Sequence, residues 1–274
     1  MLFRSRAITA GWRRSGDSIG LIPTMGALHA GHLELVSIAK RRCKRAVVSI
    51  FVNPAQFAPT EDFDKYPRTW DSDLAQLTTV GCDLVWAPEK LEMYPDGFAT
   101  RIEPKGAARG LETDSRPHFF GGVATVCCKL FTQVGPDIAV FGEKDYQQLC
   151  VIRQMVRDLD LPLEIVGAET VREPDGLAMS SRNRFLTPQE RAKAVTIHRA
   201  IRAIAAVAAR GDDPAAVIAA ARRQLTDAGF ATIDYLEVRD AHTLQPIAPS
   251  SPAPKRVLAA AGLGTTRLID NVAV

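Results

Sequence analysis

Short apolar runs alternate with longer stretches of helical periodicity through the first part of this chain. The apolar runs predict strands at residues 19–22, 46–52, 83–87, 138–141 and 163–166. The stretches between them predict helices at residues 32–42, 71–80, 123–134 and 145–159. This alternation is typical of a parallel sheet with crossover helices. It therefore predicts an α/β fold with a Rossmann-like, doubly wound parallel sheet.

The pattern changes after about residue 168. Two long helical stretches rich in Ala and Arg, at residues 188–210 and 214–228, precede apolar runs at residues 233–239, 256–261 and 267–271. Four prolines between residues 246 and 254 predict a loop between two of these last strands. We therefore expect a Rossmann-like domain at residues 1–168 and a smaller α+β domain at residues 169–274.

Composition restricts the class of partner. The 274 residues include 34 Lys and Arg and 31 Asp and Glu, a formal net charge of +3 that is modest for a nucleic-acid-binding protein. No apolar run approaches the roughly 18–20 residues of a membrane-spanning helix, and no secretory signal precedes the first strand. The five cysteines are scattered, which argues against a disulfide framework. These features predict a cytoplasmic protein that acts on small molecules, with no nucleic-acid or membrane partner.

The first candidate site is the sequence Pro-Thr-Met-Gly-Ala-Leu-His-Ala-Gly-His at residues 23–32. It joins a predicted strand to a predicted helix, so we expect free backbone N–H groups and the positive end of the helix dipole at this loop. His29 and His32 can donate to phosphate oxygens there. The alternative is a pair of structural histidines satisfied by the backbone, and a zinc site is less favoured because no third ligand follows.

Two further strand ends carry polar groups. Asn53 and Gln56 form either an ordinary Asn-Pro turn or a set of donors and acceptors for a polar substrate. In the segment 142–148, Gly142 permits close approach and Lys144 can reach a polyphosphate, although a capped helix with solvated charges is the alternative. Ligands of doubly wound sheets bind beyond the carboxyl ends of the strands. These two segments are therefore expected to share one cleft with the first.

The segment 175–184 contains Ser180, Ser181 and Arg182 after a flexible Asp-Gly turn. Hydroxyls beside arginines can close over a polyanion, while the alternative is an ordinary linker between domains. A nucleophilic serine is disfavoured because no Gly-x-Ser-x-Gly sequence surrounds either serine.

Taken in order, these four segments resemble the pantothenate synthetases, the pantoate–β-alanine ligases of the HxGH nucleotidylyltransferase superfamily. The resemblance covers nearly the whole chain and includes residues 61–69 and 264–271. One difference is that His118 stands one place earlier than the histidine of the family's corresponding stretch.

The resemblance implies ATP-dependent condensation of pantoate with β-alanine through a pantoyl adenylate, with Mg²⁺ as a cofactor, in a homodimer. It implies that His29, His32 and Lys144 are catalytic, with His32 as the proton donor. The implied ATP-binding residues are Thr24, Met25, Gly26, His29, Gly31, His32, Gly142, Glu143, Lys144, Asp145, Val171, Met179, Ser180, Ser181 and Arg182. The implied pantoate-binding residues are Asn53, Gln56 and Gln148, and Gln56 is also implied for β-alanine. Asn53, Glu112 and Arg116 are further candidates for orientation or for β-alanine. No metal ligand is assigned.

Two other functions remain open from the sequence. One is another HxGH adenylyltransferase, acting on a phosphopantetheine or on nicotinamide mononucleotide, which does not need the Asn53 and Gln56 pair or the second domain. The other is a nucleic-acid-binding module related to class I tRNA synthetases, which the modest charge and the lack of an identifiable anticodon-binding appendage argue against.

Overall fold

The computed structural model describes residues 2–57, 63–64 and 66–274. Part of the segment 61–69 that resembles the family therefore lies outside the described residues. The chain divides into two compact units, the first comprising Met1–Glu143 with Val151–Glu169 and the second comprising Lys144–Cys150 with Thr170–Val274. It stays a prediction that residues 1–168 bind the nucleotide and pantoate and that residues 169–274 carry the loop of Met179–Asn183.

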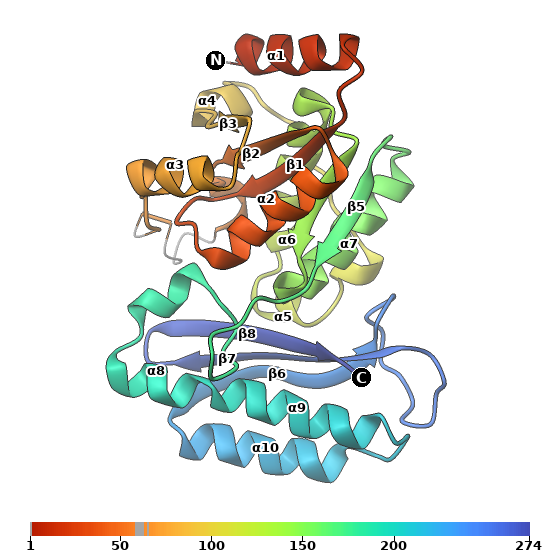
Figure 1. Cartoon of the computed structure of the whole chain (residues 1–274). Helices are drawn as coiled ribbons and strands as arrows, with labels where there is room; N and C mark the ends of the chain where they lie inside the picture. The colour runs from red at the N-terminus through yellow and green to blue at the C-terminus, as the bar shows by residue number, and fades with distance from the viewer. Residues whose placement is uncertain (1, 58–62, 65) are drawn as a thin grey trace. The chain divides into compact units, whose positions relative to one another are not determined.

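The first unit is built on a five-stranded parallel sheet in the order β3-β2-β1-β4-β5 (Figure 1). The strands are β1 (Ile19–Thr24), β2 (Arg45–Ile50), β3 (Leu84–Trp86), β4 (Ile138–Gly142) and β5 (Glu164–Ala168). The central strands are almost completely buried, as expected when helices cover both faces. The predicted doubly wound sheet is confirmed.

Helices cover both faces of this sheet. The helices of this part of the chain are α1 (Leu2–Arg14), α2 (Ala30–Arg42), α3 (Trp70–Thr79), α4 (Lys90–Met93), α5 (Glu112–Ser115), α6 (Phe119–Val134) and α7 (Tyr146–Asp158), which begins in the second unit. Val36 and Ala39 of α2 pack in one cluster with Val48 and Val140 of the strands. On the opposite face, the ring of Phe131 in α6 meets that of Phe141 in β4 edge-on at 6.3 Å.

The second unit pairs a three-stranded antiparallel sheet with helices (Figure 1). Its elements are α8 (Pro188–Ala194), α9 (Thr196–Ala208), α10 (Ala215–Asp227), β6 (Phe230–Asp240), β7 (Lys255–Leu263) and β8 (Thr266–Ala273). Apolar side chains of α9, α10 and the strands form one buried core, in which Ile197, Ile201 and Ile204 are fully enclosed. The expected α+β architecture is confirmed, and the four prolines lie in the loop between β6 and β7 as predicted.

Several elements differ from the sequence prediction, among them the short helices α4 and α5, which were not predicted. Helix α1 was not predicted, and α6 begins at Phe119 rather than near residue 123. The helix predicted at residues 188–210 is divided at Val195, where two β-branched residues in succession, Val195 and Thr196, lower helix propensity. Among the described helices, none combines the length and apolar character that crossing a membrane requires.

Candidate active site

Three loops meet at one edge of the parallel sheet. Strand β1 lies between β2 and β4, and the chain order of the strands reverses here. This reversal is the topological switch point at which doubly wound sheets bind ligands. The loop after β1 carries His29, the loop after β2 carries Asn53, and Gly142 ends β4. The carboxyl ends of these three strands therefore lie at the same edge of the sheet, and the cleft that the three segments are expected to share stays a prediction.

His29 and His32 are held by a reciprocal pair of hydrogen bonds at the start of α2. The backbone N–H of Gly31 donates to Nδ1 of His29 at 3.2 Å, and the N–H of His29 donates to Nδ1 of His32 at 3.3 Å. The ring centroids are 4.2 Å apart. Because both Nδ1 atoms act as acceptors, each neutral ring carries its proton on Nε2. The backbone therefore fixes a tautomer in which Nε2 is the donor.

Six backbone N–H groups of this loop are not left open for a ligand, contrary to the sequence prediction. The N–H groups donate within the chain at Gly26, Ala27, Leu28, His29, Gly31 and His32. Some of these hydrogen bonds cap the start of α2, and the others fix the conformation of the loop. These six groups therefore do not form the backbone cradle for phosphate that the sequence predicted.

The first two motifs are in direct contact. The amide of Gln56 donates to Sδ of Met25 at 3.0 Å, and Ala27 packs in one cluster with Phe57. Gln56 is only 8% exposed, and its side-chain oxygen Oε1 accepts from Nδ2 of Asn53 at 3.2 Å. These contacts use one N–H and one lone pair of the Gln56 amide, so one of each is left for a polar ligand.

Asn53 has no hydrogen-bond position left. Its Oδ1 accepts from the hydroxyl of Tyr94 at 2.7 Å and from the N–H of Ala55 at 3.3 Å. Its Nδ2 donates to Gln56 and to the carbonyl of Gly122 at 3.1 Å. Asn53 is also 1% exposed. We therefore revise the prediction that Asn53 contacts pantoate and assign it the task of orienting Gln56.

Gly122 and Arg116 complete the surroundings of Gln56. A Cβ atom at Gly122 would lie 2.1 Å from the carbonyl oxygen of Ala55, so only glycine lets α6 approach this turn. The guanidinium of Arg116 donates to the main-chain carbonyl oxygen of Gln56 at 3.2 Å and forms an ion pair with the carboxylate of Glu112 at 3.5 Å. Two of the further candidates from the sequence, Glu112 and Arg116, therefore lie next to the predicted substrate loop.

The segment 142–148 is shared by the two units. Gly142 and Glu143 belong to the first unit, while Lys144 and the residues through Cys150 belong to the second. The Nζ atom of Lys144 lies 3.6 Å from Oδ1 of Asp145, and its side chain is 20% exposed. Gln148 is half-buried.

Within the second unit, the segment around Met179 folds back on Val171. The N–H of Met179 donates to the carbonyl of Val171 at 3.0 Å, so these two predicted nucleotide contacts are neighbours. Ser180 then caps a short 3-10 helix, η4 (Ser181–Phe185), by accepting from the N–H of Arg182 at 3.3 Å. This cap directs the hydroxyl of Ser180 to the backbone of Arg182.

A buried network that the sequence analysis missed connects this segment with Lys144. Arg172 donates to both carboxylate oxygens of Asp270, at 2.8 and 2.9 Å, and to the carbonyl of Gly176 at 2.9 Å. The next residue, Asn271, donates through Nδ2 to the carbonyl of Lys144 at 2.9 Å. Two predicted phosphate-binding segments are thereby fixed to one end of β8. The only sequence signal for this network was that residues 264–271 resemble the family, and no neighbouring residue indicated that they contact Arg172 and Lys144.

Asp270 is ionised within this network. Burial raises the pKa of the Asp270 carboxyl, but the nearby ring of His198, whose Nδ1 lies 3.4 Å away, and the hydrogen bonds from Arg172 outweigh it and hold this pKa below the ordinary aspartate value of 3.8. A lowered pKa stabilises the folded state above pH 3.8, and this stabilisation is lost as the pH falls through the folded-state pKa.

We expect Asp270→Asn to lower the free energy of unfolding at pH 7 by about 3 kcal/mol, because Arg172 loses its charged partner in a buried site. The difference between the variant and the wild type should shrink below pH 3.8. Denaturant unfolding between pH 3 and pH 7 measures both effects. The control is Asp212→Asn, which removes an exposed pair with Arg210 and should change little. A constant difference at every pH would contradict the assignment.

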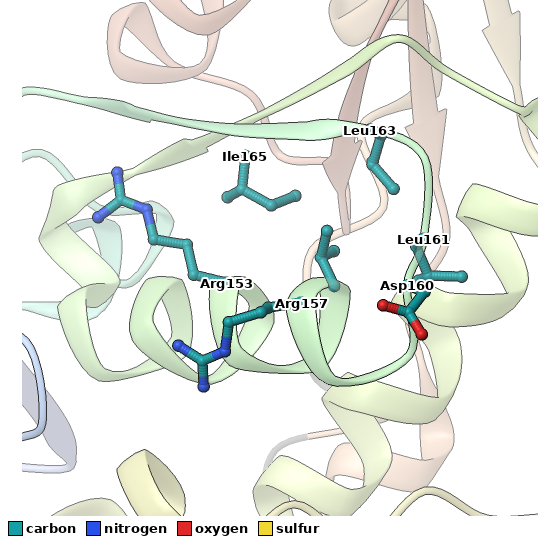
Figure 2. A pocket seen from close by; sticks show the side chains of 7 residues that line it. Arg153, Arg157, Asp160, Leu161, Leu163 and Ile165 are labelled. Atoms are coloured by element: carbon teal, nitrogen blue, oxygen red, sulfur yellow. The ribbon is translucent and has the colours of Figure 1, made fainter.

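A separate hollow of the first unit lies between α7 and the edge strand β5. It measures about 640 Å³, and Figure 2 shows Leu163 and Ile165 from the strand side facing Arg153 and Arg157 of the helix. Leu163 and Ile165 stand at the amino end of β5, whereas His29 follows the carboxyl end of β1. This hollow is therefore not part of the candidate active site.

Comparisons with known proteins agree on one family. The family model described as pantoate-beta-alanine ligase matches residues 3–273. A pantothenate synthetase of Bradyrhizobium sp. strain BTAi1 is 58% identical over 258 residues, which are 94% of this chain and 91% of that protein. The crystal structure of a Thermus thermophilus pantothenate synthetase superposes with a TM-score of 0.90 at 46% identity and covers 96% of each chain.

A Francisella tularensis pantoate-beta-alanine ligase, crystallised with beta-gamma ATP and beta-alanine, superposes with a TM-score of 0.84 at 33% identity and covers 99% of this chain and 95% of that one. These matches favour neither the other adenylyltransferases nor a nucleic-acid-binding module. The chain belongs to the pantoate–β-alanine ligase family.

Proposed function

We propose that this enzyme joins pantoate to β-alanine with ATP, giving pantothenate, AMP and pyrophosphate. A carboxylate oxygen is a poor leaving group, so pantoate must first be activated. In the first step its carboxylate attacks the α-phosphorus of ATP, pyrophosphate leaves, and pantoyl adenylate forms. In the second step the amine of β-alanine attacks the acyl carbon, and AMP leaves with the electron pair of the broken C–O bond.

The protein contributes position and charge stabilisation in the first step. Negative charge grows on the departing pyrophosphate, and groups that are already oriented toward it lower the barrier. The Nε2–H groups of His29 and His32 donate to the phosphates, and Lys144 neutralises the β- and γ-phosphates. Ser180, Ser181 and Arg182 close over the triphosphate. Gly142 and Asp145 line the nucleoside, and Val171 contacts the adenine side through its backbone. The remaining ATP-binding residues are Thr24, Met25, Gly26, Gly31, Glu143 and Met179.

Gln56 and Gln148 hold pantoate, and Gln56 also meets β-alanine. A side-chain amide both donates and accepts, which suits a substrate that has hydroxyl groups and a carboxylate. This role of Gln56 is supported by its hydrogen bonds to Asn53 and Met25, which fix the orientation of its amide from two sides.

Magnesium is proposed to enter with the nucleotide. Among the described residues, no three His, Cys, Asp or Glu side chains are grouped so that they could hold a metal ion. The oxygens of the triphosphate must then supply most of the ligands, which is usual for Mg²⁺ in nucleotide sites. The bound ion neutralises phosphate charge.

The observation that carries this proposal is the pair of histidines whose Nδ1 atoms accept from the backbone, in a chain that matches the ligase family from residue 3 to residue 273. The test is exchange of labelled pyrophosphate into ATP. Exchange should require pantoate, should not require β-alanine, and should not be supported by phosphopantetheine or nicotinamide mononucleotide. Exchange without pantoate would reject the proposal.

The proposed orienting role of Asn53 predicts a distinct variant. Asn53→Ala leaves the hydroxyl of Tyr94 and the carbonyl of Gly122 without their partner, which costs about 1–3 kcal/mol of folding free energy. We expect the KM for pantoate to rise about tenfold, because the Gln56 amide is no longer fixed. Steady-state kinetics and thermal unfolding measure these changes.

Tyr94→Phe is the matched control. It removes one hydrogen bond of Asn53 but leaves the bond from Asn53 to Gln56 in place. Its KM for pantoate should stay within about threefold of the wild type. An equal rise in both variants would mean that Asn53 acts only on stability.

The proposals on quaternary structure and on the cellular compartment rest on the family resemblance alone. We propose a homodimer that works in the cytoplasm, and analytical ultracentrifugation tests the dimer directly.

A further inference from the structure

A buried carboxylate on α3 holds the loop that leads to the two histidines. Asp73 is 1% exposed and lies in the first turn of α3. Its Oδ2 accepts from the N–H of Ala27 at 3.0 Å, and its Oδ1 accepts from the N–H of Leu28 at 2.9 Å. Thr69 donates its hydroxyl to Oδ1 at 3.0 Å. Both oxygens act as acceptors, which is the role of an ionised carboxylate.

The conformation that Asp73 holds is an unusual one. Gly26 and Ala27 have φ angles of +83° and +52°, so two successive residues lie in the left-handed region, and one of them is not glycine. A non-glycine residue persists there only when its surroundings fix it. A Cβ atom on Gly26 would lie 3.1 Å from Oδ2 of Asp73, so the carboxylate packs directly against this turn.

Asp73 also has an unusual position for a negative charge. It lies beneath a loop proposed to bind a triphosphate, and in the part of the chain that the structure describes no basic side chain pairs with it. Its charge is balanced by N–H groups that would otherwise be available to the phosphates. The loop gives up these donors in exchange for a fixed path into His29, which directly follows Leu28.

We propose that Asp73 is a positioning residue for adenylate formation. Its carboxylate fixes Ala27 and Leu28, and through them it fixes His29 at the start of α2 and the bonded ring of His32. The Nε2–H groups then face the phosphates in one orientation. This inference rests on the proposed function, because it assigns to Asp73 a share of the first half-reaction only.

The test compares the two half-reactions in Asp73→Asn. The amide can accept from only one of the two loop N–H groups and presents a donor to the other. We expect pantoate-dependent pyrophosphate exchange to fall about 10- to 100-fold. Transfer of the pantoyl group from supplied pantoyl adenylate to β-alanine should stay within about threefold, because pyrophosphate has no part in it.

Two control variants separate positioning from stability. Asp71→Asn makes the same substitution in the same first turn of α3, at an exposed position, and should leave both half-reactions within about twofold. Thr69→Val removes the hydroxyl that donates to the Asp73 carboxylate but keeps both hydrogen bonds between this carboxylate and the loop. Its thermal midpoint should fall while its exchange rate stays within about threefold.

A measurement on the unaltered protein covers the case in which Asp73→Asn does not fold. The amides of Ala27 and Leu28 should exchange with solvent hydrogen as slowly as those of β1. Exchange within seconds would overturn the proposal. So would an Asp73→Asn variant that keeps its exchange rate, or one that loses both half-reactions by the same factor. If the unaltered protein shows no pantoate-dependent exchange, the proposed function itself fails, which is a distinguishable result.

Discussion

His32→Asn should lower the rate of pantoyl-adenylate formation at least a hundredfold and leave the protein folded. The side-chain oxygen of Asn can take the place of Nδ1 and accept from the N–H of His29, so the cap of α2 is kept. The donor at Nε2 has no counterpart in Asn. Loss of one donor to a developing charge costs about 2.7–4 kcal/mol of transition-state stabilisation. Pantoate-dependent pyrophosphate exchange measures this loss.

His32→Gln is the complementary variant. Its amide can place an N–H near the position of Nε2 but cannot cap the N–H of His29 through the same short contact. It should therefore retain more exchange activity than His32→Asn and lose more stability. His242→Asn, at an exposed position in the second unit, should change neither property. If His32→Asn keeps near-normal exchange, Nε2 of His32 has no part in the reaction.

The fold could be predicted because its signals are local. Parallel strands buried on both faces appear as uninterrupted apolar runs, and each predicted run corresponds to an observed strand. The helix α1 escaped prediction since nothing marks its start, and its buried polar residues Ser5 and Thr9 do not follow an apolar period. The break at Val195 also lacks the Gly or Pro that usually ends a helix.

The candidate site was predicted only in part, because a motif shows which residues are present and not what holds them. Asn53 reads as a polar residue at a strand end, yet its amide is saturated by Tyr94, Ala55, Gln56 and Gly122. The loop residues that Asp73 holds, Ala27 and Leu28, are more than forty positions away in the sequence. Such contacts depend on the register of the whole sheet.

The same limit explains the incorrect prediction of open backbone donors. A strand, a glycine-containing loop and a helix suggest a backbone cradle for phosphate. In this chain the N–H groups of Ala27 and Leu28 go to Asp73, and that of His29 goes to the ring of His32. Under the proposed function, recognition of the anion then depends on the imidazoles, whose orientation the backbone sets, and on charged side chains from outside this loop.

Lys144→Met should lower the rate of adenylate formation at least a hundredfold while transfer to β-alanine stays nearly unchanged. Methionine keeps most of the length and the apolar stem of lysine and removes only the charge. The charge of Lys144 is proposed to act on the β- and γ-phosphates, which leave as pyrophosphate before β-alanine reacts. The carbonyl of Lys144 still accepts from Asn271, so the backbone position is retained.

The two half-reactions again separate the alternatives. Pyrophosphate exchange measures the first, and conversion of supplied pantoyl adenylate with β-alanine measures the second. Lys193→Met, at an exposed position on α8 in the same unit, controls for the loss of a positive charge and should leave both rates unchanged. Equal losses in both half-reactions of Lys144→Met would show that Lys144 supports the structure of the second unit. An unchanged exchange rate would remove its charge from the mechanism and leave the histidines as the principal donors to the leaving pyrophosphate.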